Sequence, residues 1–414
     1  MHIALVTHHY APEHGAPQRR WAAFTRRFIA AGHQVTVLTP PPHYPSGRAG
    51  ELTADVSAGA VTEGALGERI IRVRFREHND SLISRSLDQA VSALDSFGRG
   101  LHHFRQPSRR PDVVIATAPG LPSIPAGMAL GSMLRRPTVV EMRDAWPDLI
   151  APSGMMGPDD ASSPGGAKRF AIRFAHERIM DLQRNSAAVV TTTESFAEVL
   201  RNRGVHDPQV IRNGSTVELL PIMEPPPLDR SGLRVLYLGT MGRSQGLGTA
   251  IQAAKLAAAH GLKITLRFVG SGADDEVLRA QADALRAPVE FVSRCTPAEV
   301  AEHYEWADTS LVMLRGWGPF DWTVPSKLYE IMAVRRHVSA SLNGEAARVV
   351  QEAEAGFVTA PEDATALAHA WLDLAAHREK LDVGNTARTW VINNVHHDLL
   401  AARYLDLLHH VADR

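Results

Sequence analysis

The chain has 414 residues, of which 44% are hydrophobic and 21% are charged, and its formal net charge is -1. This length exceeds what one ordinary hydrophobic core supports and favours two domains, while the near-zero charge argues against nucleic acid as a partner. The single cysteine, Cys295, excludes an internal disulfide and a cysteine zinc site, which suits a reducing cytoplasm.

The first half of the chain alternates apolar runs with helical periodicity. Residues 2–7, HIALVT, predict a first strand rather than a signal peptide, and we expect no membrane span because no apolar run reaches about 18 residues. A helix follows over 19–33 with Trp21, Phe24 and Phe28 on one side, and Gly32 ends it. Further strands and helices are expected at 34–40, 69–75, 80–106, 111–119, 137–144, 168–186, 187–193 and 208–214, with a mobile loop at 153–167. In the helix over 80–106, a leucine-rich stripe is roughly in phase and consists of Leu82, Leu87, Val91, Leu94 and Phe97.

Residues 221–232, PIMEPPPLDRSG, interrupt this periodicity and predict a stiff connector. The alternation restarts beyond it, with strands at 233–240, 264–270, 288–293, 309–314, 336–341 and 356–360. Such alternation builds parallel sheets. We therefore predict an α/β fold of two doubly wound Rossmann-like domains that face each other across a cleft: residues 1–220, the linker 221–232, residues 233–390, and a C-terminal helix at 391–414 that packs back on the first domain.

Open α/β sheets bind ligands beyond the carboxyl ends of their strands. In the first half, Gly15 and Arg19 follow the first strand, where a tight turn and a solvated arginine are the competing interpretations. No GxGxxG follows that strand, which argues against a pyridine-nucleotide dehydrogenase. Asp144 ends another strand beside Trp146, either to orient a reacting hydroxyl or to cap a turn.

The second half places glycines and cations at successive strand ends. The segment at 237–248, YLGTMGRSQGLG, carries Gly239, Gly242 and Arg243, and FVGSG carries Gly270. Residues 324–333, VPSKLYEIMA, then put Ser326, Lys327 and Glu330 at a helix start, which is either a capped surface helix with an N-cap Ser or an anion site. Together these features predict a nucleoside-diphosphate site, with no metal: the 20 histidines, among them His8, His9, His14 and His33, are scattered without an HExxH pair.

The order of these motifs resembles the retaining GT-B glycosyltransferases of family four over nearly the whole chain. It is most similar to the branch for cell-surface polysaccharide and fucosamine-type transfer. The resemblance is carried by YAPEHGAPQRRWAAFTRRFIAAGHQVTVLTP, PDVVIATAP, EMRDAWPDL, VIRNGSTVELL, LYLGTMGRSQGLGTAIQAA, LRFVGSG, VPSKLYEIMA and GEAARVVQEAEAGFV.

The resemblance implies a cytoplasmic hexosyl- or N-acetylhexosaminyl-transferase without a cofactor or metal. It implies a nucleotide-sugar donor, commonly UDP-linked, held by the second domain, and a glycan, lipid-linked or small-molecule acceptor on the first. The catalytic residues carried over are Asp144, Arg243 and Lys327. The donor-binding residues are Gly15, Arg19, Gly239, Gly242, Gly270, Ser326, Leu328, Glu330, Asp321 and Glu345, of which Glu330 matches the second glutamate of the family's pair and holds the ribose.

Three positions depart from the family pattern. Trp322 stands where the first glutamate is expected, and the neighbouring Asp321 is the candidate replacement. Gln245 stands where a lysine usually follows the loop arginine, so Lys327 is expected to supply that charge. Arg143 occupies the place of a histidine, which argues against a general base there.

Two other functions use the same fold class. A nucleotide-sugar 2-epimerase needs a further set of acidic and histidine side chains around the sugar, and a carbohydrate-binding protein needs no catalysis at all. The first helix is basic, with Arg19, Arg20, Arg26 and Arg27. Together with the aromatic residues Trp21 and Phe24, it indicates either peripheral contact with the inner membrane surface or a solvated basic face above a buried aromatic side.

Overall fold

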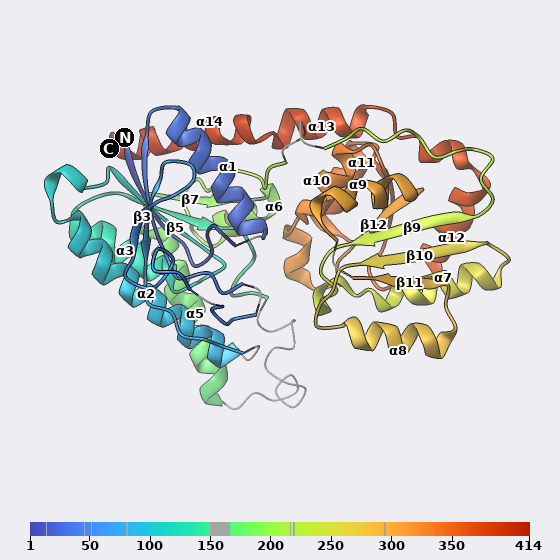
Figure 1. Cartoon of the computed structure of the whole chain (residues 1–414), viewed down its shortest axis with the longest axis horizontal. Coiled ribbons are helices and arrows are strands. Elements are labelled where there is room, and N and C mark those ends of the chain that lie inside the picture. The colour runs from blue at the N-terminus through green and yellow to red at the C-terminus, as the bar shows by residue number, and fades with distance from the viewer. Residues whose placement is uncertain are drawn as a thin grey trace. The chain divides into compact units, whose positions relative to one another are not determined.

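A computed structural model describes residues 1–13, 15–44, 46–50, 52–79, 82–149, 166–215, 217, 220–293 and 295–414. The chain divides into two compact α/β units (Figure 1). Unit 1 comprises Met1–Asn213 together with His397–Arg414, and unit 2 comprises Gly214–His396. Almost all of the expected mobile loop at 153–167 lies outside the described residues.

The sheet of unit 1 has the strand order β3-β4-β2-β1-β5-β6-β7-β8. Its described strands are parallel except where β3 runs antiparallel to β4. The chain moves from β1 outwards on one side and then restarts on the other side with β5, so the topological switch point lies between these two strands. The strands are β1 (His2–Val6), β2 (Gln34–Thr39), β3 (Val61–Glu63), β4 (Arg69–Arg72), β5 (Val113–Thr117), β6 (Thr138–Met142), β7 (Ala188–Thr191) and β8 (Gln209–Val210).

Helices cover both faces of this sheet. Figure 1 shows α2 and α3 along one face, while α1 and α14 pack together along the other. The helices of unit 1 are α1 (Ala16–Ala30), α2 (Leu82–Phe104), α3 (Ser123–Leu134), α5 (Gly166–Arg184), α6 (Glu194–Asn202) and α14 (His397–Ala412), with a short 3-10 turn η1 (Pro107–Arg109).

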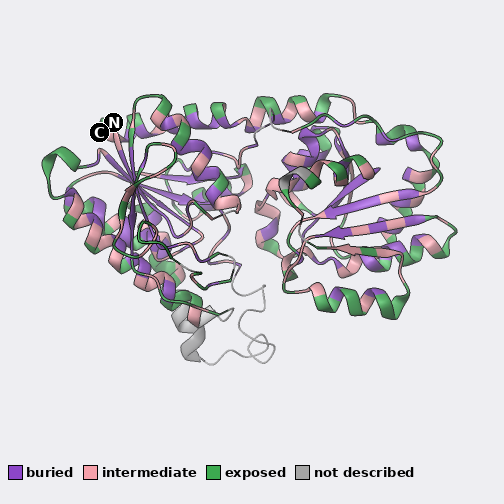
Figure 2. Ribbon diagram, viewed as in Figure 1, coloured by how far each residue is buried: buried purple, intermediate pink, exposed green. Residues whose placement is uncertain are grey.

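Apolar runs form the central strands because both of their faces are covered. All residues of β5 and β6 are buried, and Figure 2 shows the interior of the sheet in purple. Helix α1 buries Trp21, Phe24 and Phe28 on its inner side. It ends at Ala30 with Ala31 as C-cap, and Gly32, which the sequence predicts at this end, follows with a φ of +84° and donates its N–H to the carbonyl of Ile29.

Helix α2 forms where the sequence predicts a helix, but its buried side is not the leucine stripe. Leu87 and Leu94 are exposed, whereas Asp88, Ser92 and Ser96 are buried. Asp88 can be buried because its carboxylate accepts hydrogen bonds from the backbone N–H of Arg76 (3.1 Å) and contacts the His8 ring (3.0 Å). Ser92 and Ser96 bond within the helix, whereas the partners of Asp88 come from other segments of the chain.

Helix α14 completes the core of unit 1. Its Tyr404 packs against Trp21 and Phe24 and donates a hydrogen bond to Oε2 of Glu141 at 3.1 Å. The other oxygen of this fully buried carboxylate accepts from Nε of buried Arg20 at 2.8 Å. Arg20 is therefore part of the interior and not of a basic surface.

Unit 2 contains a parallel sheet in the order β11-β10-β9-β12-β13-β14. Its switch point lies between β9 and β12. The strands are β9 (Leu233–Leu238), β10 (Ile264–Val269), β11 (Val289–Val292), β12 (Thr309–Met313), β13 (His337–Ser341) and β14 (Gly356–Thr359). The helices are α7 (Gly248–Ala259), α8 (Asp275–Leu285), α9 (Pro297–Trp306), α10 (Ser326–Ala333), α11 (Gly344–Glu352), α12 (Ala364–Ala376) and α13 (Thr386–Val395), with 3-10 turns η3 (Arg243–Gln245), η4 (Gly318–Trp322) and η5 (Arg378–Leu381).

The boundaries between the units differ from those expected. The proline-rich stretch 221–232 belongs to unit 2, because the Arg378 guanidinium donates to the carbonyl of Pro227 (2.9 Å) and Arg336 donates to that of Glu224 (3.0 Å). The expected single helix at 391–414 is instead the end of α13 followed by α14, and the chain returns to unit 1 at His397.

Candidate functional site

The loops after β9 and β12 meet at the switch point of unit 2. Nε of Arg315, which follows β12, donates to the carbonyl of Arg243 at 2.7 Å, and the Arg315 N–H donates to the carbonyl of Ser244 at 2.9 Å. These bonds hold the Arg243 loop in place through its backbone. The Arg243 guanidinium itself is mostly exposed, with Nε 4.0 Å from a carboxylate oxygen of Asp274, so it is accessible to an anion.

Glycines let the loop after β9 and the loop after β10 approach each other closely. A Cβ on Gly270, where φ is +137°, would lie 2.0 Å from the carbonyl oxygen of Gly239. A Cβ on Gly272 would lie 2.2 Å from the carbonyl oxygen of Met241. Both distances are far below an ordinary contact, so these positions require glycine. The predicted Gly239 and Gly270 therefore lie in one packed backbone surface at the ends of β9 and β10, whereas Gly242 contacts the side chain of Gln245.

Helix α10 begins next to this surface. Pro325 is its N-cap and Ser326 its first helical residue, without a side-chain cap, so the interpretation of Ser326 as N-cap is wrong. The N–H groups in the first turn of a helix have no intrahelical acceptors and attract anions. Leu328 is fully buried and its N–H donates to the carbonyl of Pro325 at 3.0 Å, so its part is to anchor the helix.

Lys327 brings the two predicted motifs together. Its Nζ lies 2.9 Å from Oε2 of Glu330, and its Cε lies 4.0 Å from the place that a Cβ on Gly239 would occupy. Both side chains of this ion pair are about a quarter exposed, with 27% for Lys327 and 20% for Glu330. A cation and a carboxylate thus stand beside a glycine turn at the carboxyl edge of the sheet.

Gln245 has a structural part in this site. Its side-chain oxygen accepts the N–H of Gly242 at 3.1 Å and so closes the turn that presents Arg243. The position that departs from the family pattern therefore stabilises the loop rather than supplying a charge.

Asp321 and Glu345 lie around the start of α11. A Cβ on Gly344, where φ is +64°, would be 2.0 Å from the carbonyl oxygen of Asp321, so the two backbones touch. Burial raises the pKa of the Asp321 carboxyl, and Glu345 is 3% exposed with a guanidinium nitrogen of Arg348 3.9 Å away. Asp321 and Glu345 are thus neighbours at the start of α11 in unit 2.

The predicted residues of unit 1 occupy two strand ends. Gly15 is the N-cap of α1 and lies in extended backbone, and Arg19 is exposed on the first turn. Asp144 is half-buried just past β6, where burial raises the pKa of its carboxyl although the neighbouring Arg143 guanidinium lowers it. Buried Trp21 and Phe24 cannot insert into a membrane, which removes the aromatic part of that hypothesis. Among the described helices, none is long and apolar enough to cross a bilayer.

Sequence reasoning missed a group of histidines in unit 1. His8, His9 and His43 converge at the ends of β1 and β2, and His78 and Asp88 adjoin them. The interpretation of His8 and His9 as scattered composition overlooked this convergence. Only the HH pair and the histidine of PPHYP could have signalled it in the sequence, and His78 and Asp88 come from distant segments.

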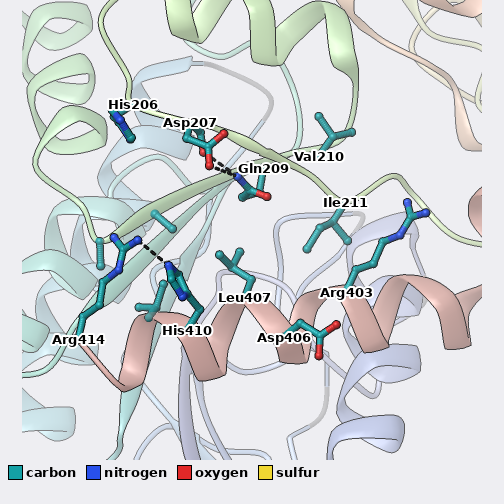
Figure 3. Close-up of a pocket in the computed structure, with 13 residues that line it drawn as sticks. His206, Asp207, Gln209, Val210, Ile211, Arg403, Asp406, Leu407, His410 and Arg414 are labelled. Atoms are coloured by element: carbon teal, nitrogen blue, oxygen red, sulfur yellow. Dashed lines mark hydrogen bonds between the residues drawn. The ribbon is translucent and has the colours of Figure 1, made fainter.

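A separate cavity of about 420 Å³ lies in unit 1 between α14 and the edge of the sheet at β7 and β8 (Figure 3). Asp207 and Gln209 are hydrogen bonded to each other on one side, and His410 and Arg414 on the other. The lining contains none of the predicted site residues.

Two family models match the chain. The model described as glycosyl transferase 4-like domain matches residues 15–214, and the one described as glycosyl transferases group 1 matches residues 232–377. Among curated proteins, the chain is 24% identical over 346 residues to the Escherichia coli K12 protein WcaI, whose name assigns it to colanic acid biosynthesis as a glycosyl transferase. This match covers 81% of each protein.

Solved structures share the fold. Sucrose-phosphate synthase from Thermosynechococcus elongatus superposes with a TM-score of 0.74 at 18% identity, covering 99% of this chain and 98% of that one. Anabaena HepE, solved with UDP and glucose, superposes with a TM-score of 0.66 at 15% identity, covering 98% of this chain and 99% of that one. The two doubly wound units and the matched segments define a glycosyltransferase of the GT-B class. Within that class, the chain belongs to family four.

Proposed function

We propose that the protein is a retaining glycosyltransferase that moves a hexosyl or N-acetylhexosaminyl group from a UDP-sugar to a hydroxyl of a glycan or lipid-linked acceptor. The main support is that Lys327 lies close to the Gly239 turn while its Nζ donates a hydrogen bond to Oε2 of Glu330. These residues are distant in the sequence, and the fold brings them to the edge of the sheet where nucleotides bind in this architecture. The UDP bound to HepE makes UDP the first nucleotide to test.

In this proposal, Glu330 accepts hydrogen bonds from the ribose hydroxyls. The start of α10, Lys327 and Arg243 contact the diphosphate, which gains negative charge as the bond to the sugar breaks. Because the glycine turns leave no side chains over that backbone, a phosphate can approach it directly. The diphosphate itself then takes the proton of the acceptor hydroxyl on the face from which it departs, so the anomeric configuration is retained.

Unit 1 is proposed to bind the acceptor. Asp144 offers the acceptor a half-buried carboxyl at the end of β6, whereas Gly15, the N-cap of α1, remains proposed for the donor. A hydroxyl held by that carboxyl keeps a fixed direction, which is the positioning that transfer requires. Exposed Arg19 and Arg26 on α1 can attract an anionic acceptor or an anionic membrane surface.

The donor site is tested in two stages. A thermal-shift screen with UDP-, GDP-, dTDP- and ADP-sugars identifies the nucleotide, because a ligand that binds only the native state raises its stability. Slow hydrolysis of the selected donor then gives turnover, and analysis of the released sugar separates transfer from 2-epimerisation.

Lys327→Ala and Arg243→Ala are each expected to lower turnover by about 100-fold, or about 3 kcal/mol, since each removes one cation from the departing diphosphate. Lys255→Ala is the matched control, because Lys255 is exposed on α7 outside the proposed site. Turnover unchanged in both site variants refutes the assignment of the donor site.

A further inference from the structure

Three histidines gather at the carboxyl ends of β1 and β2 in unit 1. His8 and His9 follow β1, and His43 follows β2. The turn after β5 closes the group from the other side, because a Cβ on Gly120 would lie 2.7 Å from Cβ of His8. His8 is 5% and His43 is 3% exposed, while His9 is half-buried and gives access from solvent.

The geometry of the group suits a metal ion. One ligand atom from each of His8, His9 and His43 can be chosen so that all lie within 4.8 Å of one another. The ring centroids of His8 are 4.9 Å from those of both His9 and His43, and the latter two rings are 5.3 Å apart. A second set with the same spacing shares His43 and adds His78 and Asp88.

Hydrogen bonds determine which nitrogen of His43 is available. Its Nδ1 lies 2.8 Å from the carbonyl oxygen of Pro41, and because a carbonyl can only accept, Nδ1 carries the proton. Nε2 therefore holds a lone pair. This atom is buried and has no hydrogen-bond partner among the described residues. A buried acceptor without a partner is unfavourable unless a ligand occupies its lone pair.

The other two rings are oriented in the same manner. Nδ1 of His9 lies 3.3 Å from Oε2 of Glu13, and Nε2 of His8 lies 3.0 Å from Oδ2 of Asp88. In each ring, one nitrogen thus lies next to a carboxylate or carbonyl oxygen. Proteins orient histidines in this way when the second nitrogen binds a metal. Glu13 is itself fixed, because its Oε1 accepts the backbone N–H groups of His43 (2.6 Å) and Tyr44 (2.8 Å).

We propose that His8, His9 and His43 bind one Zn²⁺ ion, with Asp88, Glu13 and the Pro41 carbonyl orienting the three rings. Imidazole nitrogens suit Zn²⁺, and three protein ligands leave a fourth position open to water or to an oxygen of a bound molecule. The ion would tie the loop after β1 to the loop after β2. This proposal concerns unit 1 and does not depend on the donor site of unit 2.

The test is metal binding by the full chain without an affinity tag. After dialysis against EDTA and then against buffer, equilibrium dialysis with Zn²⁺ followed by metal analysis gives stoichiometry and affinity. Co²⁺ replaces Zn²⁺ in a parallel titration, where a visible absorption band indicates that the bound ion has a low coordination number. We expect one ion per chain, at least about 100-fold weaker binding in His9→Ala and His43→Gln, and about 10–100-fold weaker binding in Glu13→Gln.

His102→Ala is the matched control, since His102 is exposed on α2 outside the group, and it should bind like the wild type. Circular dichroism checks folding, and if the His43 variant does not fold, the half-buried His9 variant decides. Absence of saturable Zn²⁺ binding in the wild-type protein overturns the proposal. So does undiminished binding in His9→Ala, and loss in His78→Ala with full binding in His8→Ala would assign the ion to the other set.

Discussion

Replacing Gly272 by Ala perturbs the proposed donor site without removing any polar side chain from it. The new Cβ would lie 2.2 Å from the carbonyl oxygen of Met241 and 2.8 Å from its nitrogen, where ordinary contacts begin at 3.4 Å. These are backbone atoms and cannot rotate away. Met241 is fully buried, its N–H donates to the carbonyl of Ser271 (3.1 Å), and its carbonyl accepts from Asp274 (3.0 Å). The segment must therefore move by more than an ångström, and Arg243 moves with it.

Two magnitudes follow from this displacement. Misplacing a catalytic group by about 1 Å costs on the order of 100-fold in rate. Overpacking a well-packed interior costs about 1–3 kcal/mol of stability. Gly272→Ala should therefore lower kcat/KM for donor hydrolysis by about 100-fold and lower the free energy of unfolding by about 1–3 kcal/mol.

Donor hydrolysis and urea unfolding measure the two effects in the same preparation. Gly98→Ala is the control, because Gly98 lies in α2 with open space around it and should gain about 0.5–1 kcal/mol without a change in turnover. A Gly272 variant with turnover within twofold of the wild type and unchanged stability would refute the claim that close backbone packing positions Arg243.

Two further predictions concern buried groups. Glu141→Ala removes the acceptor of both Arg20 and Tyr404 and should lower the free energy of unfolding by about 3–5 kcal/mol at pH 7, measured in urea; a loss below about 1 kcal/mol would contradict it. Burial lowers the pKa of His337 to about 3, so the unfolded chain binds the proton first and acid destabilises the native state. Between pH 6.5 and pH 4, protonation of this histidine should lower the free energy of unfolding of the wild type by about 3 kcal/mol, and His337→Asn should lack this loss. If the free energy of unfolding fell equally with pH in the two proteins, this prediction would be wrong.

Most strands were predictable because their signal is local. Segments such as 3–6 and 113–116 are continuous apolar runs, and a run of that kind is typical of a strand buried in a parallel sheet. The end of α1 was predictable for the same reason, since a glycine with positive φ stops a helix by its own conformation. Local patterns also located α2, but they could not tell which of its faces is buried.

Features that depend on partners from distant segments were not predictable from periodicity. Asp88 can be buried because its carboxylate contacts the His8 ring and accepts the N–H of Arg76. Neither partner is its neighbour in the sequence. The histidine group draws on several loops in the same way. For Lys327, local sequence indicated only a charge at a helix start, and its place beside Gly239 follows from the strand order of the sheet. A side chain's charge can be read locally, whereas its partner is set by the topology.

The return of the chain to unit 1 at His397 has a consequence for biosynthesis. Residues 1–213 leave the ribosome first, yet Arg20 and Glu141 lack the Tyr404 hydroxyl until α14 has been translated. Trp21 and Phe24 stay uncovered on the same side during the synthesis of the whole of unit 2. Unit 1 is thus completed by a helix that is translated only after the whole of unit 2, and during that interval its exposed aromatic surface is open to chaperones.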